Sequence, residues 1–194
     1  MSPERISALL ADVAAGRVRP DVALDQLRHL PFESLGFASI DHHRHLRQGQ
    51  PEVIFCQGKT PEQVVAIAER LVERSGSFLG TRADRSHIEA LRARFPGLEV
   101  NELGRTVRVA PAGSRPAPRG RLLIVSAGTS DLPVAEEAGA TAEAFGLVVE
   151  RIADVGVAGI HRVLASTDRL SAADVVIVVA GMEGALPSVV GGLV

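Results

Sequence analysis

The sequence contains no tryptophan and no tyrosine, and it has a single cysteine, Cys56. Phenylalanine is therefore its only aromatic residue type, and the chain has little with which to stack nucleic-acid bases. A lone cysteine excludes an intramolecular disulfide framework and is typical of a reducing compartment, so we expect a cytoplasmic location. Because Cys56 follows an apolar run at residues 53–55, we expect a small buried residue rather than a nucleophile.

The chain also lacks a large excess of either charge and any long apolar run. Its formal net charge is −2 over 194 residues, so nothing in it favours a nucleic-acid partner. No apolar run approaches the roughly 20 residues that span a bilayer, and residues 1–5 do not open a signal peptide. Hydrophobic residues make up 46% of the sequence, which predicts one or two domains with a real core and no membrane partner.

Residues 1–110 carry a mixture of helical and strand patterns. Apolar positions three and four apart predict helices near residues 6–16, 22–30, 60–72 and 86–95. Thr60 and Pro61, followed by Gln63, form the signature of a capped helix start. Short apolar runs predict strands at residues 52–55, 77–80, 98–100 and 106–109. We therefore expect an α+β domain at residues 1–110, without a specified strand pairing.

Residues 111–120 separate this domain from the rest of the chain. The segment contains Pro111, Pro116 and Pro118 together with glycine and serine, and it shows no apolar periodicity. This composition is typical of a linker. We place the second domain at residues 121–194.

The second domain repeats a strand, a turn and a helix three times. Its strands, expected at residues 121–125, 147–152 and 174–180, are nearly continuous apolar runs of the kind found in parallel sheets covered on both faces. Helices between them predict right-handed crossovers and a flavodoxin-like, doubly wound α/β sheet. The first turn lacks the G-x-G-x-x-G fingerprint of dinucleotide-binding Rossmann folds.

The turn after the first strand contains candidate ligand-binding residues: Ser126, Gly128, Thr129, Ser130 and Asp131. Small and polar residues at this edge of an open α/β sheet are typical of a ligand crevice. Hydroxyls and helix N-terminal amides could bind phosphate or ribose oxygens there. The alternative is that Ser130 or Asp131 only caps the following helix.

The turns after the other two strands carry further candidates. His161 could move a proton and Arg162 could bind a phosphate or carboxylate, or the pair could be an exposed part of a helix's first turn. Glu183, between Gly181 and Gly184, could act as a base or could only complement the following helix dipole. Convergence of all three turns on one sheet edge favours the functional interpretation.

The run from Asp41 to His45 invites a metal interpretation. Its spacing matches no standard zinc pattern, and adjacent histidines cannot all face one ion in a regular element. We expect no metal site here. Instead, we expect His42, His43 and Arg44 to contact a charged ligand at the domain interface.

Seven segments of the chain carry recognisable motifs. They lie at residues 35–38, 41–44, 51–55, 58–62, 126–133, 156–162 and 180–193. Together they resemble the LarB family, the carboxylase and hydrolase enzymes that begin nickel-pincer nucleotide biosynthesis. The resemblance covers essentially all of the chain outside the linker. The second domain is also similar, more distantly, to the aminoimidazole ribonucleotide carboxylases and mutases of the purine pathway.

This resemblance implies carboxylation of the pyridinium ring of nicotinate adenine dinucleotide by carbon dioxide or bicarbonate. Hydrolysis of the phosphoanhydride then gives AMP and pyridinium-3,5-biscarboxylate mononucleotide. In the family, a cysteine in the C-terminal stretch is expected to add to the ring, creating an enamine-like carbon that attacks carbon dioxide. No tightly bound cofactor is implied, although magnesium is a candidate aid to hydrolysis. A symmetric homo-oligomer is also implied.

The resemblance assigns roles to the polar residues. The expected catalytic residues are His161, Glu183 and Asp131. The expected substrate-binding residues are Ser126, Gly128, Thr129, Ser130, Asp131, Arg162, Gly181, His42, His43 and Arg44. No residue is assigned to a metal.

The sequence departs from the family pattern at its C-terminal end. Family members continue with a further strand, a glycine-rich turn and a helix before the expected cysteine, so we expect a truncated chain with an open sheet edge that depends on association. Two alternatives stay open. One is a ribonucleotide carboxylase or mutase of the purine pathway, which the matching first domain argues against, and the other is a non-catalytic nucleotide-binding protein.

Overall fold

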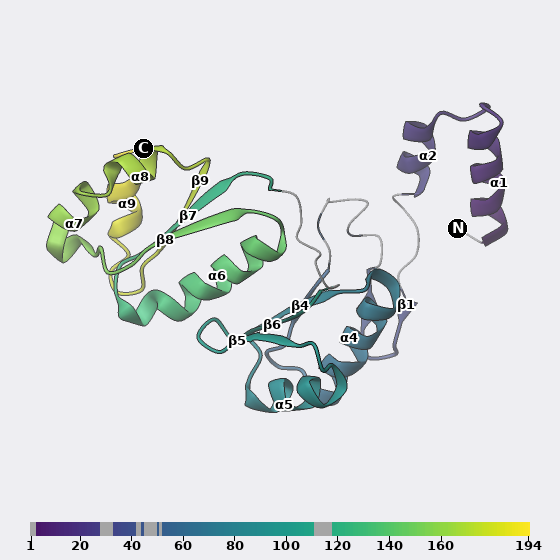
Figure 1. Cartoon of the computed structure of the whole chain (residues 1–194), viewed down its shortest axis with the longest axis horizontal. Helices are drawn as coiled ribbons and strands as arrows, with labels where there is room; N and C mark the ends of the chain where they lie inside the picture. The colour runs from purple at the N-terminus through teal and green to yellow at the C-terminus, as the bar shows by residue number, and fades with distance from the viewer. Residues whose placement is uncertain (1–2, 28–32, 42–43, 45–49, 51, 111–117) are drawn as a thin grey trace.

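The computed structural model describes residues 3–27, 33–41, 44, 50, 52–110 and 118–194 (Figure 1). At the amino end, α1 (Pro3–Ala14) and α2 (Pro20–Leu27) pack against each other. The strands β1 (Glu33–Ser34) and β2 (Ser39–Ile40) then form a short antiparallel pair. The sequence pattern predicts both helices, and the described part of the second ends at Leu27.

A four-stranded mixed sheet forms the centre of the first domain. Its strands are β3 (Val53–Phe55), β4 (Phe78–Thr81), β5 (Glu99–Asn101) and β6 (Thr106–Val109). They lie in the order β3-β4-β6-β5, with β3 parallel to β4 and β6 antiparallel to both of its neighbours. The sequence predicts each of these strands, whereas the order comes only from the structure.

Two helices, α4 (Pro61–Ser75) and α5 (Arg85–Arg94), pack together and complete this domain. α4 begins with the expected capping box, in which the side chains of Thr60 and Gln63 each accept a hydrogen bond from the other residue's backbone amide. The helix ends at Gly76, which adopts the left-handed conformation at a φ of 72°. The buried core includes Ile54, Val64, Ile67, Ala68, Leu71, Phe78, Leu91 and Val107.

The second domain contains three parallel strands in the order β8-β7-β9. The central strand is β7 (Arg121–Ser126), flanked by β8 (Val148–Ile152) and β9 (Val175–Val179). After β7 the chain enters the short 3₁₀ helix η1 (Thr129–Asp131), and after β8 it enters η2 (Val157–Gly159). Both 3₁₀ helices lie at the carboxyl edge of the sheet.

Helices cover both faces of this sheet, which confirms the α/β fold class expected from the sequence. Leu122 and Ile124 pack in a buried layer with α6 (Leu132–Ala144). Leu123 and Val125 point to the other face, since side chains alternate along a strand. That layer is completed by α7 (Ile160–Leu164), α8 (Thr167–Ser171) and α9 (Leu186–Gly191).

α6 also contacts the turn between β5 and β6 of the first domain (Figure 1). A Cβ atom on Gly104 in this turn would lie 2.9 Å from backbone atoms of Glu136 and Glu137. Arg82 donates a hydrogen bond of 2.5 Å to the Glu137 carboxylate, and the Asn101 side-chain amide donates one of 3.2 Å to Glu136. The helix that begins at the candidate site is therefore held by the first domain one turn after its start.

Candidate functional site

The turn after β7 is closed by the side chain of Asp131. Its Oδ2 atom accepts a hydrogen bond of 2.8 Å from the backbone amide of Gly128. The Asp131 amide in turn donates to the Gly128 carbonyl at 3.1 Å. Thr129 and Ser130 lie exposed on the outside of this turn, where a ligand could reach them.

The same carboxylate reaches the turn after β9. Its Oδ1 atom accepts a hydrogen bond of 2.9 Å from the amide of Gly181, a residue 50 positions away. A Cβ atom on Gly181 would lie only 3.2 Å from this oxygen, so glycine suits the position. Glu183, two residues later, is exposed and adopts a left-handed φ of 53°. Asp131 thus ties the first and third polar turns together.

Gly156 brings the turn after β8 into contact with the turn after β7. Its amide donates a hydrogen bond of 2.9 Å to the carbonyl of Ala127, and a Cβ atom at Gly156 would lie 2.9 Å from that same oxygen. The amide of Val155 donates to the Ser126 carbonyl at 3.2 Å. The three polar turns therefore lie side by side at the carboxyl edge of the sheet.

His161 and Arg162 occupy the first turn of α7. The Arg162 guanidinium donates a hydrogen bond of 2.7 Å to the carboxylate of Asp154, and a Cβ atom on Gly159 would lie 2.7 Å from the Arg162 Nε. Asp154 has a left-handed φ of 59° in the turn after β8. The His161 residue is exposed, so it can exchange protons with solvent or with a ligand.

Ser126 has a different environment from the other candidates in its turn. The residue is 1% exposed, and its Oγ atom has no hydrogen-bond partner among the described residues. Because Ser126 shares the alternation of Leu122 and Ile124, its side chain faces the α6 layer. Its hydroxyl is therefore buried inside the domain, whereas Thr129 and Ser130 face outwards.

Of the three candidates in the first domain, His42 and His43 lie outside the described residues. Arg44 is exposed, and its amide donates a hydrogen bond of 3.2 Å to the carbonyl of Asp41. Contact between these three residues and a ligand stays a prediction.

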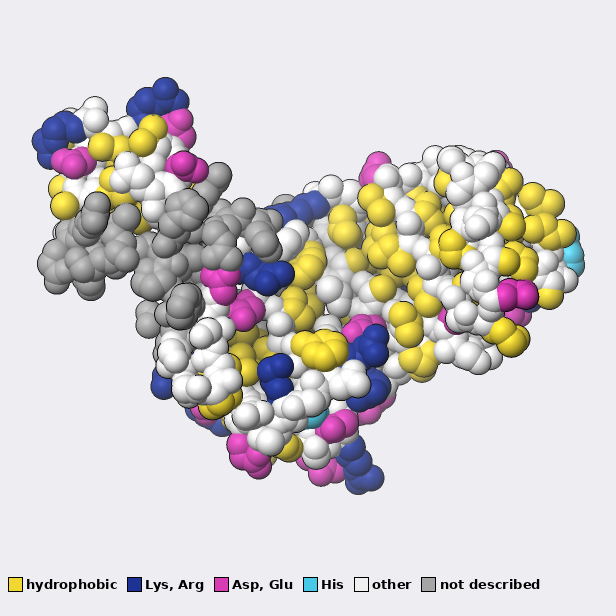
Figure 2. Space-filling view, turned by 180° about the vertical axis from the view of Figure 1, so that it is seen from behind, with side chains coloured by type: hydrophobic (Ala, Val, Ile, Leu, Met, Phe, Trp, Pro, Cys, Tyr) yellow, Lys and Arg dark blue, Asp and Glu magenta, His cyan; other side chains and the backbone are white. Residues whose placement is uncertain are grey.

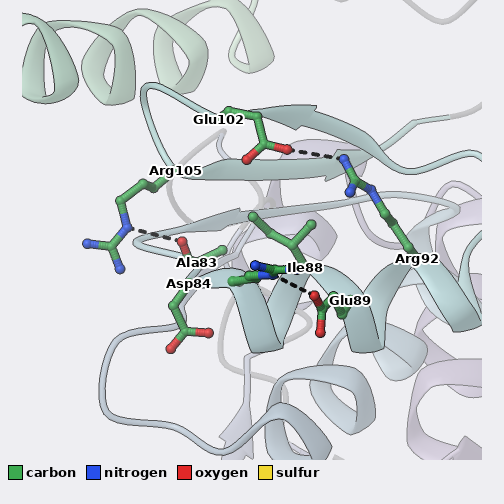
Figure 3. Close-up of a pocket in the computed structure, with 8 residues that line it drawn as sticks. Ala83, Asp84, Ile88, Glu89, Arg92, Glu102 and Arg105 are labelled. Carbon is green, nitrogen blue, oxygen red and sulfur yellow. Dashed lines mark hydrogen bonds and ion pairs between the residues drawn. The ribbon is translucent and has the colours of Figure 1, made fainter.

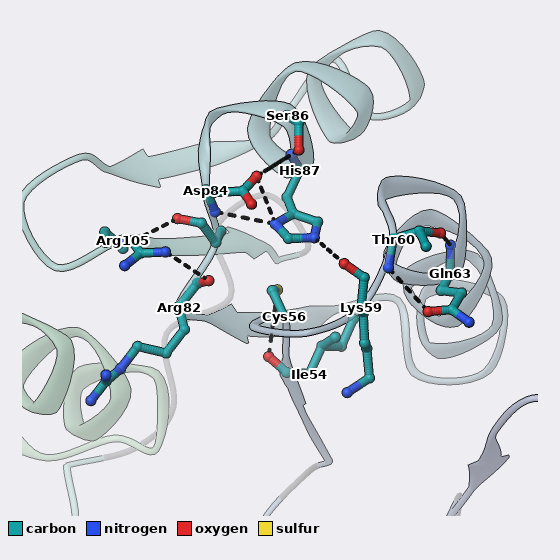
Figure 4. A network of polar contacts seen from close by, with 11 residues as sticks. Ile54, Cys56, Lys59, Thr60, Gln63, Arg82, Asp84, Ser86, His87 and Arg105 are labelled. Atoms are coloured by element: carbon teal, nitrogen blue, oxygen red, sulfur yellow. Dashed lines mark hydrogen bonds and ion pairs between the residues drawn. The ribbon is translucent and has the colours of Figure 1, made fainter.

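A polar cluster that the sequence analysis did not identify surrounds the start of α5 (Figure 4). The Asp84 carboxylate accepts a hydrogen bond of 3.0 Å from the His87 amide, and the Asp84 amide donates to Nδ1 of His87 at 3.2 Å. Nε2 of His87 lies 2.8 Å from the carbonyl of Lys59, and Nδ1 lies 2.9 Å from the Asp84 carboxylate. The Asp-x-x-His spacing at a helix start is the signal that could have revealed this capping box.

Cys56 lies beside this cluster and is wholly buried. Burial is the main cause that raises the pKa of its thiol from 9.0 to about 11, with the nearby Lys59 acting in the opposite direction. The Sγ atom lies 3.7 Å from the carbonyl of Ile54. Because the thiolate is the reactive form, these contacts support the prediction that Cys56 is a structural residue.

A cavity of about 440 Å³ opens beside α5 (Figure 3). It is lined by Ala83, Asp84, Arg85, Ile88, Glu89, Arg92, Glu102 and Arg105. Arg85 binds Glu89 at 2.8 Å, Arg92 binds Glu102 at 3.2 Å, and Arg105 donates to the carbonyl of Ala83 at 3.1 Å. The cavity is thus balanced in charge, and all of its lining residues belong to the first domain.

The described residues offer neither a metal site nor a membrane span. No group of three or more His, Cys, Asp and Glu side chains in this part of the chain could hold a metal ion. No helix in it combines the length and the apolar character needed to cross a bilayer. The three turns at the carboxyl edge of the second sheet therefore remain the strongest candidate site.

The first domain matches a known protein family, and most of the chain matches a known protein. Residues 32–111 match the family described as the LarB/PurE-like N-terminal domain. The chain is also 36% identical over 162 residues to an uncharacterized protein from Methanocaldococcus jannaschii. This match covers 80% of the chain but 63% of the relative, so the chain spans less than two thirds of the relative's length. The family match supports the resemblance drawn from the sequence motifs.

Proposed function

We propose, from the premise that residues 32–111 form a LarB/PurE-like N-terminal domain, that this chain serves the carboxylation of the pyridinium ring of nicotinate adenine dinucleotide. The domain supports a function of the carboxylase or mutase class. The particular substrate follows from the motif resemblance. Hydrolysis of its phosphoanhydride gives AMP and pyridinium-3,5-biscarboxylate mononucleotide.

The observation that carries this proposal is the joining of three polar turns into one edge. Asp131 binds the amides of Gly128 and Gly181, and Gly156 binds the carbonyl of Ala127. Parallel α/β sheets bind ligands at the carboxyl ends of their strands. One ligand placed there could contact hydroxyls, a guanidinium and a carboxylate at the same time.

The first two turns supply groups for the anionic parts of the substrate. The exposed Thr129 and Ser130 precede α6, whose N-terminal end carries a partial positive charge that favours phosphate. Arg162 can grip a second phosphate or a carboxylate in a bidentate manner, in exchange for its present contact with Asp154. Together these groups would orient a dinucleotide across the sheet edge.

The other two polar side chains suit proton transfer. Carboxylation replaces a ring C–H bond with a C–C bond, so a base must accept the ring proton after carbon dioxide has been attacked. Glu183 lies in the exposed third turn and is assigned this role. His161 is assigned proton exchange with the attacking or leaving oxygen of the phosphoanhydride hydrolysis. Both residues are reachable from solvent.

Addition of a nucleophile to the ring is not assigned to a residue of this sequence. The only cysteine, Cys56, lies buried in the first domain with a raised pKa. Among the described residues, no group of three or more His, Cys, Asp and Glu side chains could hold a metal ion. The residues at the three turns are thus assigned binding and proton transfer.

The direct test is incubation of the purified chain with nicotinate adenine dinucleotide and ¹³C-labelled bicarbonate, followed by mass spectrometry. We expect labelled biscarboxylate mononucleotide and AMP, and we expect the labelled product to form much more slowly in the Glu183→Gln variant. AMP without any labelled product would show hydrolysis alone and would contradict the carboxylation.

Non-catalytic nucleotide binding is the second candidate function, and the burial of the only cysteine favours it. It predicts that AMP binds while the dinucleotide is returned unchanged. Titration with AMP therefore accompanies the turnover assay. Exchange of Arg162 for Ala should weaken that binding, whereas exchange of Arg121 at the opposite end of β7 should leave it unchanged.

A further inference from the structure

We propose that Asp131 is a positioning residue that acts through Glu183, not a catalytic acid or base. This inference rests on the proposed function, because it divides the roles of two carboxylates in the same site. It replaces the catalytic role that the motif resemblance gives to Asp131.

The Asp131 carboxylate is directed at the backbone of two turns. Both oxygens accept hydrogen bonds from backbone amides, Oδ2 from Gly128 at 2.8 Å and Oδ1 from Gly181 at 2.9 Å. Hydrogen bonds to a carboxylate are among the stronger ones in proteins. Asp131 is only partly exposed, whereas Glu183 is exposed, so the second carboxylate has the free access to a ligand.

Asp131 is also linked to the conformation of the third turn. Gly181 precedes Glu183 by two residues, and both Glu183 and Gly184 adopt left-handed φ angles of 53° and 61°. A non-glycine residue keeps such an angle only when its surroundings impose it. The bond from Gly181 to Asp131 attaches this turn to the centre of the sheet and so restrains the backbone that carries the Glu183 side chain.

The opposite end of the parallel strands, where β7 and β9 begin, offers a matched control. There, the Asp174 carboxylate accepts a hydrogen bond of 2.7 Å from the backbone amide of Arg121. Asp174 thus connects the same two strands, β9 and β7, through the same kind of bond, but far from the three polar turns along each strand. An Asp→Asn exchange at either position removes one charge, from a carboxylate that binds two backbone amides at Asp131 and one at Asp174.

Amide hydrogen exchange of the whole ¹⁵N-labelled chain tests the contact without any assay of activity. Asparagine has one acceptor oxygen, so Asp131→Asn can keep only one of the two amide bonds. We expect the Gly128 or Gly181 amide to exchange at least about tenfold faster in this variant, the scale of a lost charge-assisted hydrogen bond. Asp174 accepts a single amide bond, which the oxygen of asparagine can still accept, so Asp174→Asn should leave the exchange of both glycine amides unchanged.

Turnover then tests whether Asp131 acts through Glu183. We expect Asp131→Asn to lower kcat about 10- to 100-fold with a smaller change in KM, and Glu183→Gln to lower kcat by at least as much. The double variant should be no slower than Glu183→Gln alone, because both changes remove one function. A purely structural defect would instead multiply the two losses, and that result would overturn the proposal.

A second variant guards against misfolding of Asp131→Asn. Gly181→Ala places a Cβ atom 3.2 Å from the Asp131 oxygen, closer than an ordinary contact, and so disturbs the hydrogen bond while both carboxylates remain. It should reproduce the loss of kcat. If the unaltered chain shows no turnover, the proposed function fails, yet the exchange experiment still decides on the contact: unchanged Gly128 and Gly181 exchange in Asp131→Asn refutes the positioning role.

Discussion

At the scale of single residues, Glu183 combines a position suited to function with a strained backbone. A left-handed φ costs a non-glycine residue about 1–2 kcal/mol. Glycine avoids this strain, but it loses about 0.5–1 kcal/mol more backbone entropy on folding. Because Glu183 has a φ of 53°, we expect Glu183→Gly to raise the free energy of unfolding by up to about 1 kcal/mol while abolishing carboxylation. Urea denaturation and the labelled-bicarbonate assay measure the two effects.

Glu183→Gln separates the effect of the backbone strain from the effect of the carboxylate. It should keep the strain, and hence the stability of the unaltered chain, but lose the proton acceptor. A Glu183→Gly variant that unfolds more easily than Glu183→Gln would show that the side chain contributes more to the fold than the backbone strain removes.

Cys56 predicts a stability change in alkaline solution. Burial raises the pKa of its thiol in the folded chain from 9.0 to about 11, so the folded state disfavours the thiolate. The resulting stabilisation is complete below pH 9 and is lost as the pH rises through about 11, because the unfolded chain releases its proton first. Urea midpoints measured between pH 8 and 11 should therefore fall less steeply for Cys56→Ala than for the unaltered chain.

Other groups titrate in the same range, but they are present in both proteins. The difference between the two pH curves therefore isolates the thiol. Parallel curves would mean that Cys56 ionises in the folded chain as easily as in the unfolded one, and they would reopen its assignment as a structural residue.

At the scale of elements, the contact between the β5–β6 turn and α6 depends on one glycine. A Cβ atom at Gly104 would lie 2.9 Å from backbone atoms of Glu136 and Glu137, and a helix backbone cannot move aside easily. We expect Gly104→Ala to lift the turn from α6, to break the contact of Arg82 with Glu137, and to cost about 1–3 kcal/mol. Faster amide exchange in the first turns of α6 would report this separation.

Gly97→Ala is the control for that experiment. Gly97 lies in the same domain, and a Cβ atom there meets nothing within 4 Å. It should leave exchange in α6 unchanged. Equal exchange in the two variants would show that the domains do not depend on the close approach at Gly104.

These elements also show what the sequence can and cannot reveal. The helix start at Thr60 and Gln63 is predictable because the residues of a capping box are three positions apart. The same local pattern is harder to recognise at Asp84 and His87, because histidine replaces the usual glutamate or glutamine. The contact between Asp131 and Gly181 joins residues 50 positions apart, so no local pattern could predict it.

The fold class can be predicted from the sequence, whereas the pairing of the strands in the first domain cannot. Apolar runs separated by helices are sufficient to predict the parallel sheet of the second domain. The mixed order β3-β4-β6-β5 of the first domain depends on long-range packing that periodicity does not encode. Burial of the Ser126 hydroxyl, in a turn that otherwise carries exposed polar residues, was likewise visible only in three dimensions.

At the scale of the whole molecule, the two outer strands of the second sheet, β8 and β9, differ in composition. The edge strand β8 carries Glu150 and Arg151, and charged residues of this kind discourage pairing with another chain. The edge strand β9 contains only valine and isoleucine, and no described strand pairs with its outer side. Figure 2 shows how much apolar surface this domain presents on the face in view.

This asymmetry predicts that the chain associates through β9 in solution. Val175 on β9 is 56% exposed and Val148 on β8 is 54% exposed, so a lysine at either place disturbs the core little. Val175→Lys adds a charge beside the apolar edge and should shift the chain toward monomer in sedimentation experiments over a range of concentrations. Val148→Lys adds the same charge to an edge that is already protected, and it should leave the association unchanged. Equal effects of the two lysines would attribute association to net charge instead of β9, and a monomeric unaltered chain at every concentration would refute it altogether.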